Sequence, residues 1–355
     1  MKNIYKIAFL FLLVPTLIFA NNGLKGKHTK TKTIKKEFSV SASATVDLDN
    51  KYGSIDIQTW DQNKVTLEII ITTKSSNESK AQKKLEDIHI EFENSNSRVY
   101  AKTKIIKSSN WNWGNNSNVN MDIQYIVRMP KSNNLVVDMD YGDVMIDVIR
   151  GKTDINLDYG KLIAGELLNN SNSINLDYSQ GTTIDYIKKG DINTDYSTIE
   201  IEKVGDISLT ADYSTITIKS SNTVEFEMDY GNLSIENARS IDGVSDYTNL
   251  IFGKIADFLS INADYGNLKV DSMGANFSTV DVNTEYIGVK IGIDGDSSFK
   301  FYGDAQNGNI NVPSNMNITN RLEKKSRTEI EGTYNGSNGK MIINTQYGSV
   351  KITEN

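Results

Sequence analysis

The chain has no cysteine among its 355 residues. This absence excludes disulfide bonds, thiolate metal sites, a cysteine nucleophile and the cysteine of a lipoprotein signal. Histidine is nearly absent too, since only His28 and His89 occur. Two isolated histidines cannot form a histidine-rich metal site, so we expect both to face solvent. No cofactor is predicted.

Basic residues are in the minority. The formal net charge is −7 and the isoelectric point is near 5.1, which argues against a nucleic-acid partner. Long apolar runs are also scarce. Lys2 and Lys6 precede the apolar run 7–19 and the small residue Ala20, which together predict a signal peptide over residues 1–20. The run is short for a membrane span and no second one follows. We therefore expect a periplasmic, surface-bound or secreted chain with no transmembrane segment.

A ten-residue phrase returns through the middle of the chain: apolar, x, apolar, Asp, Tyr, Gly or Ser, x, apolar, x, apolar. It reads INLDYGKLIA over 155–164 and INADYGNLKV over 261–270. A fixed period of this kind predicts a parallel β-solenoid with about 17–19 residues per coil. The tyrosines at its centre are predicted to form a structural ladder, and they are Tyr141, Tyr159, Tyr178, Tyr196, Tyr213, Tyr230, Tyr247, Tyr265 and Tyr286.

The apolar positions of the phrase predict which side chains face inward. Positions −4 and −2 from each tyrosine are mostly apolar, as are +3 and +5, for example Ile199 and Ile201 after Tyr196. Strict alternation along a strand places the tyrosine on the same side as −4 and −2, so the ladder is expected inside the solenoid. The odd step from 0 to +3 requires a bend, and a glycine at +1 is expected to supply positive φ.

Outward-facing aspartates at position −1 form a second predicted ladder. Neighbouring carboxylates about 4.8 Å apart repel each other, so something must offset their charge. One alternative is a hydrogen bond from the turn N–H groups to each aspartate, as in Asx turns. The other is a row of cations such as Ca²⁺, although no metal site is assigned. The row would comprise Asp158, Asp177, Asp195, Asp212 and Asp229.

The remaining segments suggest five parts. Residues 1–20 are the signal peptide and 21–36 a disordered basic leader. Residues 37–130 form an N-terminal β cap with one helix near 76–87, begun by a capping box at 75–78. Regular coils cover 131–293, and C-terminal coils with a cap cover 294–355. Late copies of the phrase are expected at 299–303 and 346–352.

Trp111 and Trp113 lie two residues apart in the polar loop 108–118. In an extended loop both indoles would face one side, which suits binding to a sugar ring or a protein. The alternative is that both fold back and cover a hairpin or a coil end.

The order of these motifs resembles a known family. YGSIDIQTW at 52–60, a short helix, VNMDIQYIVRMP at 119–130, the repeated DYG phrases and QYGSVKI at 346–352 follow one another. Together they resemble the bacterial putative-adhesin family with β-strand repeats, a domain of unknown function similar to head GIN autotransporter-adhesin domains. The resemblance implies a right-handed β-solenoid and an adhesive role, and it brings no functional residues with it.

We therefore expect a non-enzymatic secreted or cell-envelope protein that presents a repetitive surface to an unknown protein or polysaccharide. One alternative is a polysaccharide-degrading β-helix enzyme, which would need a local cluster of acidic or basic groups that breaks the repeat. Another is a periplasmic partner in envelope signalling. Exposed end coils could also pair edge to edge, so self-association is a further expectation.

Overall fold

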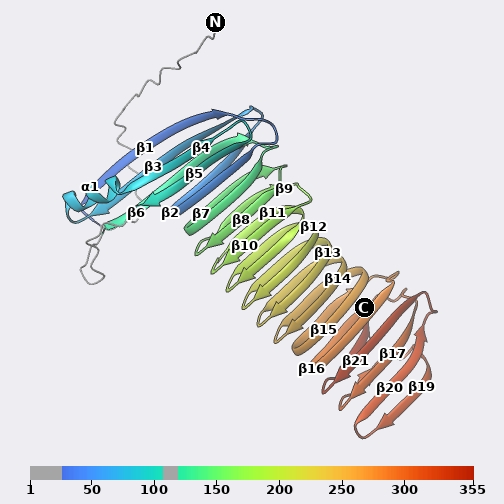
Figure 1. The fold of residues 1–355 in the computed structure, drawn as a ribbon. Coiled ribbons are helices and arrows are strands. Elements are labelled where there is room, and N and C mark those ends of the chain that lie inside the picture. Colours follow the sequence, from blue (N-terminus) through green and yellow to red (C-terminus); the bar gives the residue numbers. More distant parts are fainter. Residues whose placement is uncertain (1–25, 107–118) are drawn as a thin grey trace.

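The computed structural model describes residues 26–106 and 119–355. Within these ranges the chain is almost entirely β-strand with one short helix, as the sequence predicts. Figure 1 shows an elongated stack of strands, with a broader end formed by β1 to β6 and an opposite end formed by β17 to β21. That helix, α1, is far too short and polar to cross a membrane, and the described ranges hold no other.

The N-terminal elements are β1 (His28–Ser39), β2 (Thr45–Trp60), β3 (Lys64–Ser75), α1 (Glu78–Glu86), β4 (Ile88–Asn94), β5 (Arg98–Ile105) and β6 (Val119–Pro130). The middle of the stack contains β7 (Asn134–Ile149), β8 (Thr153–Asp158), β9 (Leu162–Leu167), β10 (Asn172–Asp177), β11 (Thr182–Asp195), β12 (Thr198–Asp212), β13 (Thr215–Asp229), β14 (Asn232–Asp246), β15 (Asn249–Met273) and β16 (Thr279–Ile293). The C-terminal elements are β17 (Phe299–Gln306), β18 (Ile310–Asn311), β19 (Asn317–Lys324), β20 (Arg327–Tyr334), β21 (Gly339–Gln346) and β22 (Val350–Glu354).

Strands in the middle of the stack pair in parallel and in register, each with the equivalent strand of the next repeat. β12 places Ile199 beside Ile216 and Asp212 beside Asp229 of β13. The apolar positions of the phrase therefore stack on one another. They form one continuous core in which Leu157, Ile174 and their equivalents are almost completely buried. Burial of these rows supplies the main driving force for the stack.

The tyrosines of the phrase lie on the outside of the stack, so the expected internal ladder is wrong. Each has a φ between 48° and 61°, in the left-handed region, while Gly142 and Gly160 at position +1 do not. A left-handed residue interrupts the alternation of the strand and turns its own side chain outward at the corner. Glycine at +1 serves another purpose: a Cβ at Gly160 would lie 1.8 Å from the carbonyl oxygen of Gly142 in the adjacent repeat.

The N-terminal end differs from the expected order at its first strand. Residues 28–39 form β1, which pairs antiparallel with β3 from His28 opposite Ser75 to Ser39 opposite Lys64. The prediction of a disordered leader is therefore wrong from residue 28 onward. Alternating lysines and threonines are compatible with a strand whose faces are both largely polar, which the composition alone did not reveal.

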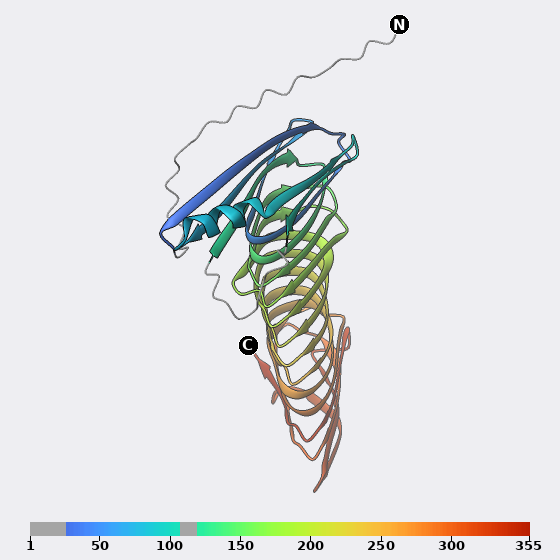
Figure 2. The ribbon, with the colours of Figure 1, turned by 60° about the vertical axis from the view of Figure 1, so that its left-hand side comes forward.

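Two sheets continue from β2 at this end. The first half of β2 pairs with β5, which pairs with β4, and the second half pairs with β6, followed by β3 and β1. Helix α1 lies beside β1 and β4 in Figure 2 and buries Ala81 and Leu85, the predicted packing stripe. Its N-cap is Asn77, whose Oδ1 accepts from the N–H of Lys80 at 3.1 Å, so the capping box predicted at Ser75 is wrong. Ser75 instead ends β3.

The C-terminal end breaks the order of the chain. β21 pairs in parallel with β16 on one side and with β17 on the other, and β22 lies between β16 and β18. The last repeat is therefore inserted between two earlier ones. Tyr302, expected as a late corner, lies within β17, and the left-handed residue of that repeat is Asn307.

Candidate functional site: an exposed tyrosine stack

Eleven tyrosine rings form one uninterrupted stack along a corner of the molecule. Adjacent ring centroids are 4.8–5.3 Å apart and the rings are within 9° of parallel. The nine predicted ladder residues all belong to it, and Tyr52 and Tyr347 extend it at the two ends.

The backbone fixes the positions of the rings. From Tyr159 to Tyr247, the N–H of each corner tyrosine donates to the carbonyl of the aspartate preceding the next tyrosine, for example Tyr196 to Asp212 and Tyr213 to Asp229, both at 3.0–3.1 Å. The spacing of the rings therefore equals the spacing of parallel strands, about 4.8 Å. The left-handed conformation costs each tyrosine roughly 1–2 kcal/mol. Stacking of aromatic pairs, worth roughly 0.5–1.5 kcal/mol each, offsets this cost.

The rings are exposed at their edges rather than at their faces. Between 38% and 51% of each stacked tyrosine is accessible to solvent. Because each inner ring is covered on both faces by its neighbours, a partner meets ring edges and phenolic oxygens. This geometry disfavours sugar rings lying flat on the aromatic faces and favours hydrogen bonds to a row of hydroxyl groups.

A row of carboxylates runs beside the stack. Asp158, Asp177, Asp195, Asp212, Asp229, Asp246 and Asp264 occupy equivalent, paired positions in successive strands, followed by Glu285. At the N-terminal end of the row, the ammonium group of Lys51 forms an ion pair with Asp140. Gln346 takes the position after Glu285, so the charge of the row ends there.

Partial desolvation, and then the neighbouring carboxylates, raise the pKa of several aspartates of the row. Desolvation is the larger cause for Asp158, Asp177, Asp212 and Asp246, and the adjacent aspartates add to it. The pKa values of several phenols in the stack are raised as well. Desolvation followed by the adjacent phenols raises the pKa of Tyr159, Tyr196, Tyr230 and Tyr265. These four carboxyls and four phenols therefore favour their neutral forms more than isolated side chains do.

The hydrogen bond of Asp229 differs from that of an Asx turn. Asp229 Oδ1 accepts from the N–H of Asp246, 3.2 Å away in the next strand. The bond thus links two repeats, whereas an Asx turn closes on its own corner. Within residues 26–106 and 119–355, no three Asp, Glu or His side chains converge as a metal site, and the cation row remains a prediction.

Amide side chains form a further row two residues before the aspartates. Asn175 Nδ2 donates to Asn156 Oδ1 at 2.7 Å, and Asn193 Nδ2 donates to Asn175 Oδ1 at 2.9 Å. On the other side of the corner, Thr198 Oγ1 donates to Gln180 Oε1 at 2.8 Å. The tyrosine stack is therefore bordered by polar groups on both sides, which hold a fixed spacing along the molecule.

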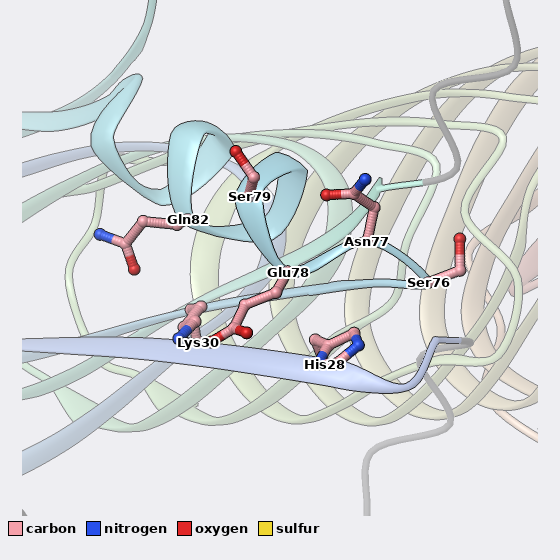
Figure 3. Close-up of a pocket in the computed structure, with 7 residues that line it drawn as sticks. All are labelled: His28, Lys30, Ser76, Asn77, Glu78, Ser79 and Gln82. Carbon is pink, nitrogen blue, oxygen red and sulfur yellow. Dashed lines mark hydrogen bonds and ion pairs between the residues drawn. The ribbon is translucent and has the colours of Figure 1, made fainter.

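Trp111 and Trp113 lie outside the described residues, so their proposed binding role stays a prediction. A shallow pocket is present at the N-terminal end, beside the start of α1 (Figure 3). In it, Lys30 Nζ forms an ion pair with Glu78 at 2.6 Å, which satisfies the charges of both. Its lining residues are His28, Lys30, Ser76, Asn77, Glu78, Ser79 and Gln82.

The ends of the stack were incompletely predicted. The prediction from the sequence omits Tyr52 and Tyr347 from the ladder, although both belong to copies of the phrase and are followed by Gly-Ser. It missed Lys51, which occupies the position of the row's aspartate in the first copy, and Asn307, which occupies the corner beyond Tyr347. The signal for Lys51 was its place immediately before Tyr52-Gly53.

No family model and no curated protein sequence matches the chain. Among solved structures, a protein described as a putative adhesin from Parabacteroides distasonis is 11% identical, with 90% of this chain and 97% of that one covered and a TM-score of 0.37. A second, also described as a putative adhesin, from Parabacteroides merdae, is 10% identical, with coverages of 90% and 96% and a TM-score of 0.33. A third, described as a putative lipid binding protein from Parabacteroides distasonis, has the same identity and coverages and a TM-score of 0.32.

The names of the first two agree with the resemblance noted from the sequence. All three overlays are loose, and none of them supports a functional assignment.

Proposed function

We propose that this chain is a non-enzymatic, exported adhesin-type protein that binds a long partner along its tyrosine stack. The observation that supports the proposal is the uninterrupted, half-exposed row of eleven rings beside a row of carboxylates. From Tyr159 to Tyr265, each repeat presents one phenol and one aspartate at the same spacing. Such a surface suits a polymeric partner, either polysaccharide or protein, that is contacted many times.

The proposed architecture is a right-handed parallel β-solenoid with coils of about 17–19 residues. Parallel pairing in register between successive repeats supports it, and the handedness follows the family resemblance. The predicted signal peptide supports export to the periplasm, the cell surface or the medium. The non-enzymatic role is supported by the regularity of the acidic row, since catalysis requires groups whose surroundings differ from one another.

Binding arrays test this function. Purified chain would be applied to a glycan array and to a panel of immobilised proteins, and bound ligands would be tested again with the triple variant Tyr196→Phe, Tyr213→Phe, Tyr230→Phe. This variant keeps the stacked rings and removes three hydroxyl groups. A matched control replaces Lys203, Ser220 and Asn237 with alanine, because these are paired, exposed positions on the three strands that follow these tyrosines.

We expect binding that weakens severalfold in the phenylalanine variant and is unchanged in the control. Equal binding by both variants would show that the stack is not the binding surface. Breakdown of any polysaccharide, with release of shorter products, would contradict the non-enzymatic assignment.

A further inference from the structure

The last repeat of the chain occupies a slot between two earlier repeats. β21 pairs along its full length with both flanking strands, so that Lys340 lies opposite Thr279 of β16 and Lys300 of β17. Backbone bonds continue on both sides of the following strand, where Val289 donates to Ser349 and Val350 donates to Asn309. Without residues 339–354, β16 and β17 would each present an unpaired strand edge inside the stack.

The segment that fills this slot also completes the hydrophobic core. Met341, Ile343 and Val350 are completely buried, and the Tyr347 ring covers that of Tyr286 at 4.8 Å. Folding of this end cannot proceed as simple addition of one repeat to the next. Both walls of the slot, β16 and β17, leave the ribosome before the segment that fills it.

The connection to the inserted repeat is short and bent. It consists of residues 335–338, in which Asn335 has a φ of 51° and Gly336 a φ of 137°. Four residues reach roughly 13–14 Å when extended. An opened connection therefore reaches an adjacent molecule whose C-terminal end lies against this one.

We propose that the slot between β16 and β17 takes up residues 339–354 from a second copy of this chain, forming a coil-exchanged dimer. Every contact that holds the segment in place is available in each copy, so the exchanged and unexchanged forms differ only in the path of residues 335–338. Exchange of an identical element is a low-cost route to a dimer. The dimer would carry two tyrosine stacks joined at their C-terminal ends.

Engineered cysteines test the exchange, since the chain has no native thiols. Asn283 and Asn344 are direct partners across β16 and β21, with Asn344 Nδ2 donating to Asn283 Oδ1 at 2.8 Å. Their backbone separation, about one strand spacing, permits a disulfide. Full-length N283C and N344C, carrying different tags, would be unfolded and refolded together, then oxidised.

The matched control is the pair N175C and N193C, whose asparagines are bonded in the same way, at 2.9 Å, between consecutive repeats. We expect the mixed disulfide between N283C and N344C to exceed that of the control pair severalfold, in a species of dimer mass. A single chain that carries both N283C and N344C serves as a second control. An internal disulfide in this chain shows that the slot forms and is filled. That internal disulfide, together with a mixed yield no higher than the control, would overturn the proposal.

Discussion

The ring of Tyr347 lies 4.8 Å from the ring of Tyr286 at an interplanar angle of 6°, although β17 to β20 lie between them in the sequence. The stack therefore follows the order of the strands in space and not their order in the chain. What the members share is a left-handed corner that turns the ring outward. Asn307 has the same left-handed conformation in the next repeat, and the stack of rings ends there because asparagine has no ring.

Substitution in the middle of the stack tests the balance between stacking and backbone strain. Tyr213 stacks on Tyr196 and Tyr230 and has a φ of 48°. We expect Tyr213→Phe to leave the free energy of unfolding nearly unchanged. Tyr213→Ala loses two stacking contacts and keeps the strained φ, which predicts a loss of about 1–3 kcal/mol. Tyr213→Gly loses the same contacts but relieves the strain, so it should be less destabilising than alanine by about 1 kcal/mol.

Denaturant unfolding of the three variants measures these differences. An alanine variant as stable as the phenylalanine variant would mean that the rings do not stabilise the stack. An alanine variant more stable than the glycine variant would contradict the left-handed conformation.

Removal of one carboxylate from the acidic row should stabilise the chain at neutral pH. Desolvation and the charges of Asp195 and Asp229 raise the pKa of Asp212 in the folded chain. The folded state therefore binds more protons than the unfolded state between the ordinary carboxyl pKa and the raised one. The free energy of unfolding therefore rises as the pH falls from the raised pKa to the ordinary carboxyl pKa. Below the ordinary pKa it rises no further, because the group is protonated in both states. Asp212→Asn should gain stability at pH 7 and lose this advantage in acid.

Asp257 serves as a control, because its pKa is shifted in the opposite direction to that of Asp212. A hydrogen bond from Ser278 and the nearby Arg239 lower the pKa of Asp257. Its stabilising contribution is present above the ordinary carboxyl pKa and disappears as the pH falls through the lowered one. Thermal unfolding from pH 7 into acid should thus show that Asp257→Asn is most destabilised at the upper end of the range. If both variants shift stability in the same direction at pH 7, the row does not repel itself.

The glycine after Tyr159 leaves no room for a side chain. A Cβ at Gly160 would lie 1.8 Å from the Gly142 carbonyl oxygen, whereas one at Gly288 would meet no atom within 4 Å. We expect Gly160→Ala to destabilise the chain by about 1–3 kcal/mol, because a backbone atom cannot move aside as a side chain does. Gly288→Ala should change stability little. Equal melting temperatures for the two variants would contradict the close approach.

The core of the stack could be predicted because its signal is local and repeated. Ile199 and Ile201 stand at positions that are apolar in most phrases, and both are buried. The direction of the tyrosines could not be predicted from alternation, since one left-handed residue reverses it. The sequence pattern offered glycine at +1 as the bend, while the structure places the bend at the tyrosine itself.

The two ends depend on interactions that no repeat reveals. Insertion of β21 between β16 and β17 is a long-range pairing, and nothing in residues 339–346 marks it. β1 is recognisable only by its partner β3, because its own residues are polar on both faces. At the surface, the position of Lys51 beside Asp140 likewise follows from the pairing of β2 with β7.

Spectrophotometric titration of the phenols tests the central claim, that the tyrosine stack lies at the surface, most directly. The account predicts that the stacked tyrosines ionise reversibly in the folded chain, over a range broadened upward by the raised pKa of Tyr159, Tyr196 and Tyr230. Tyr125, buried and bonded to Thr103 at 2.9 Å, should ionise only on unfolding, because burial raises its pKa strongly. If most phenols remained un-ionised until the chain unfolded, the rings would lie inside and the account would be contradicted.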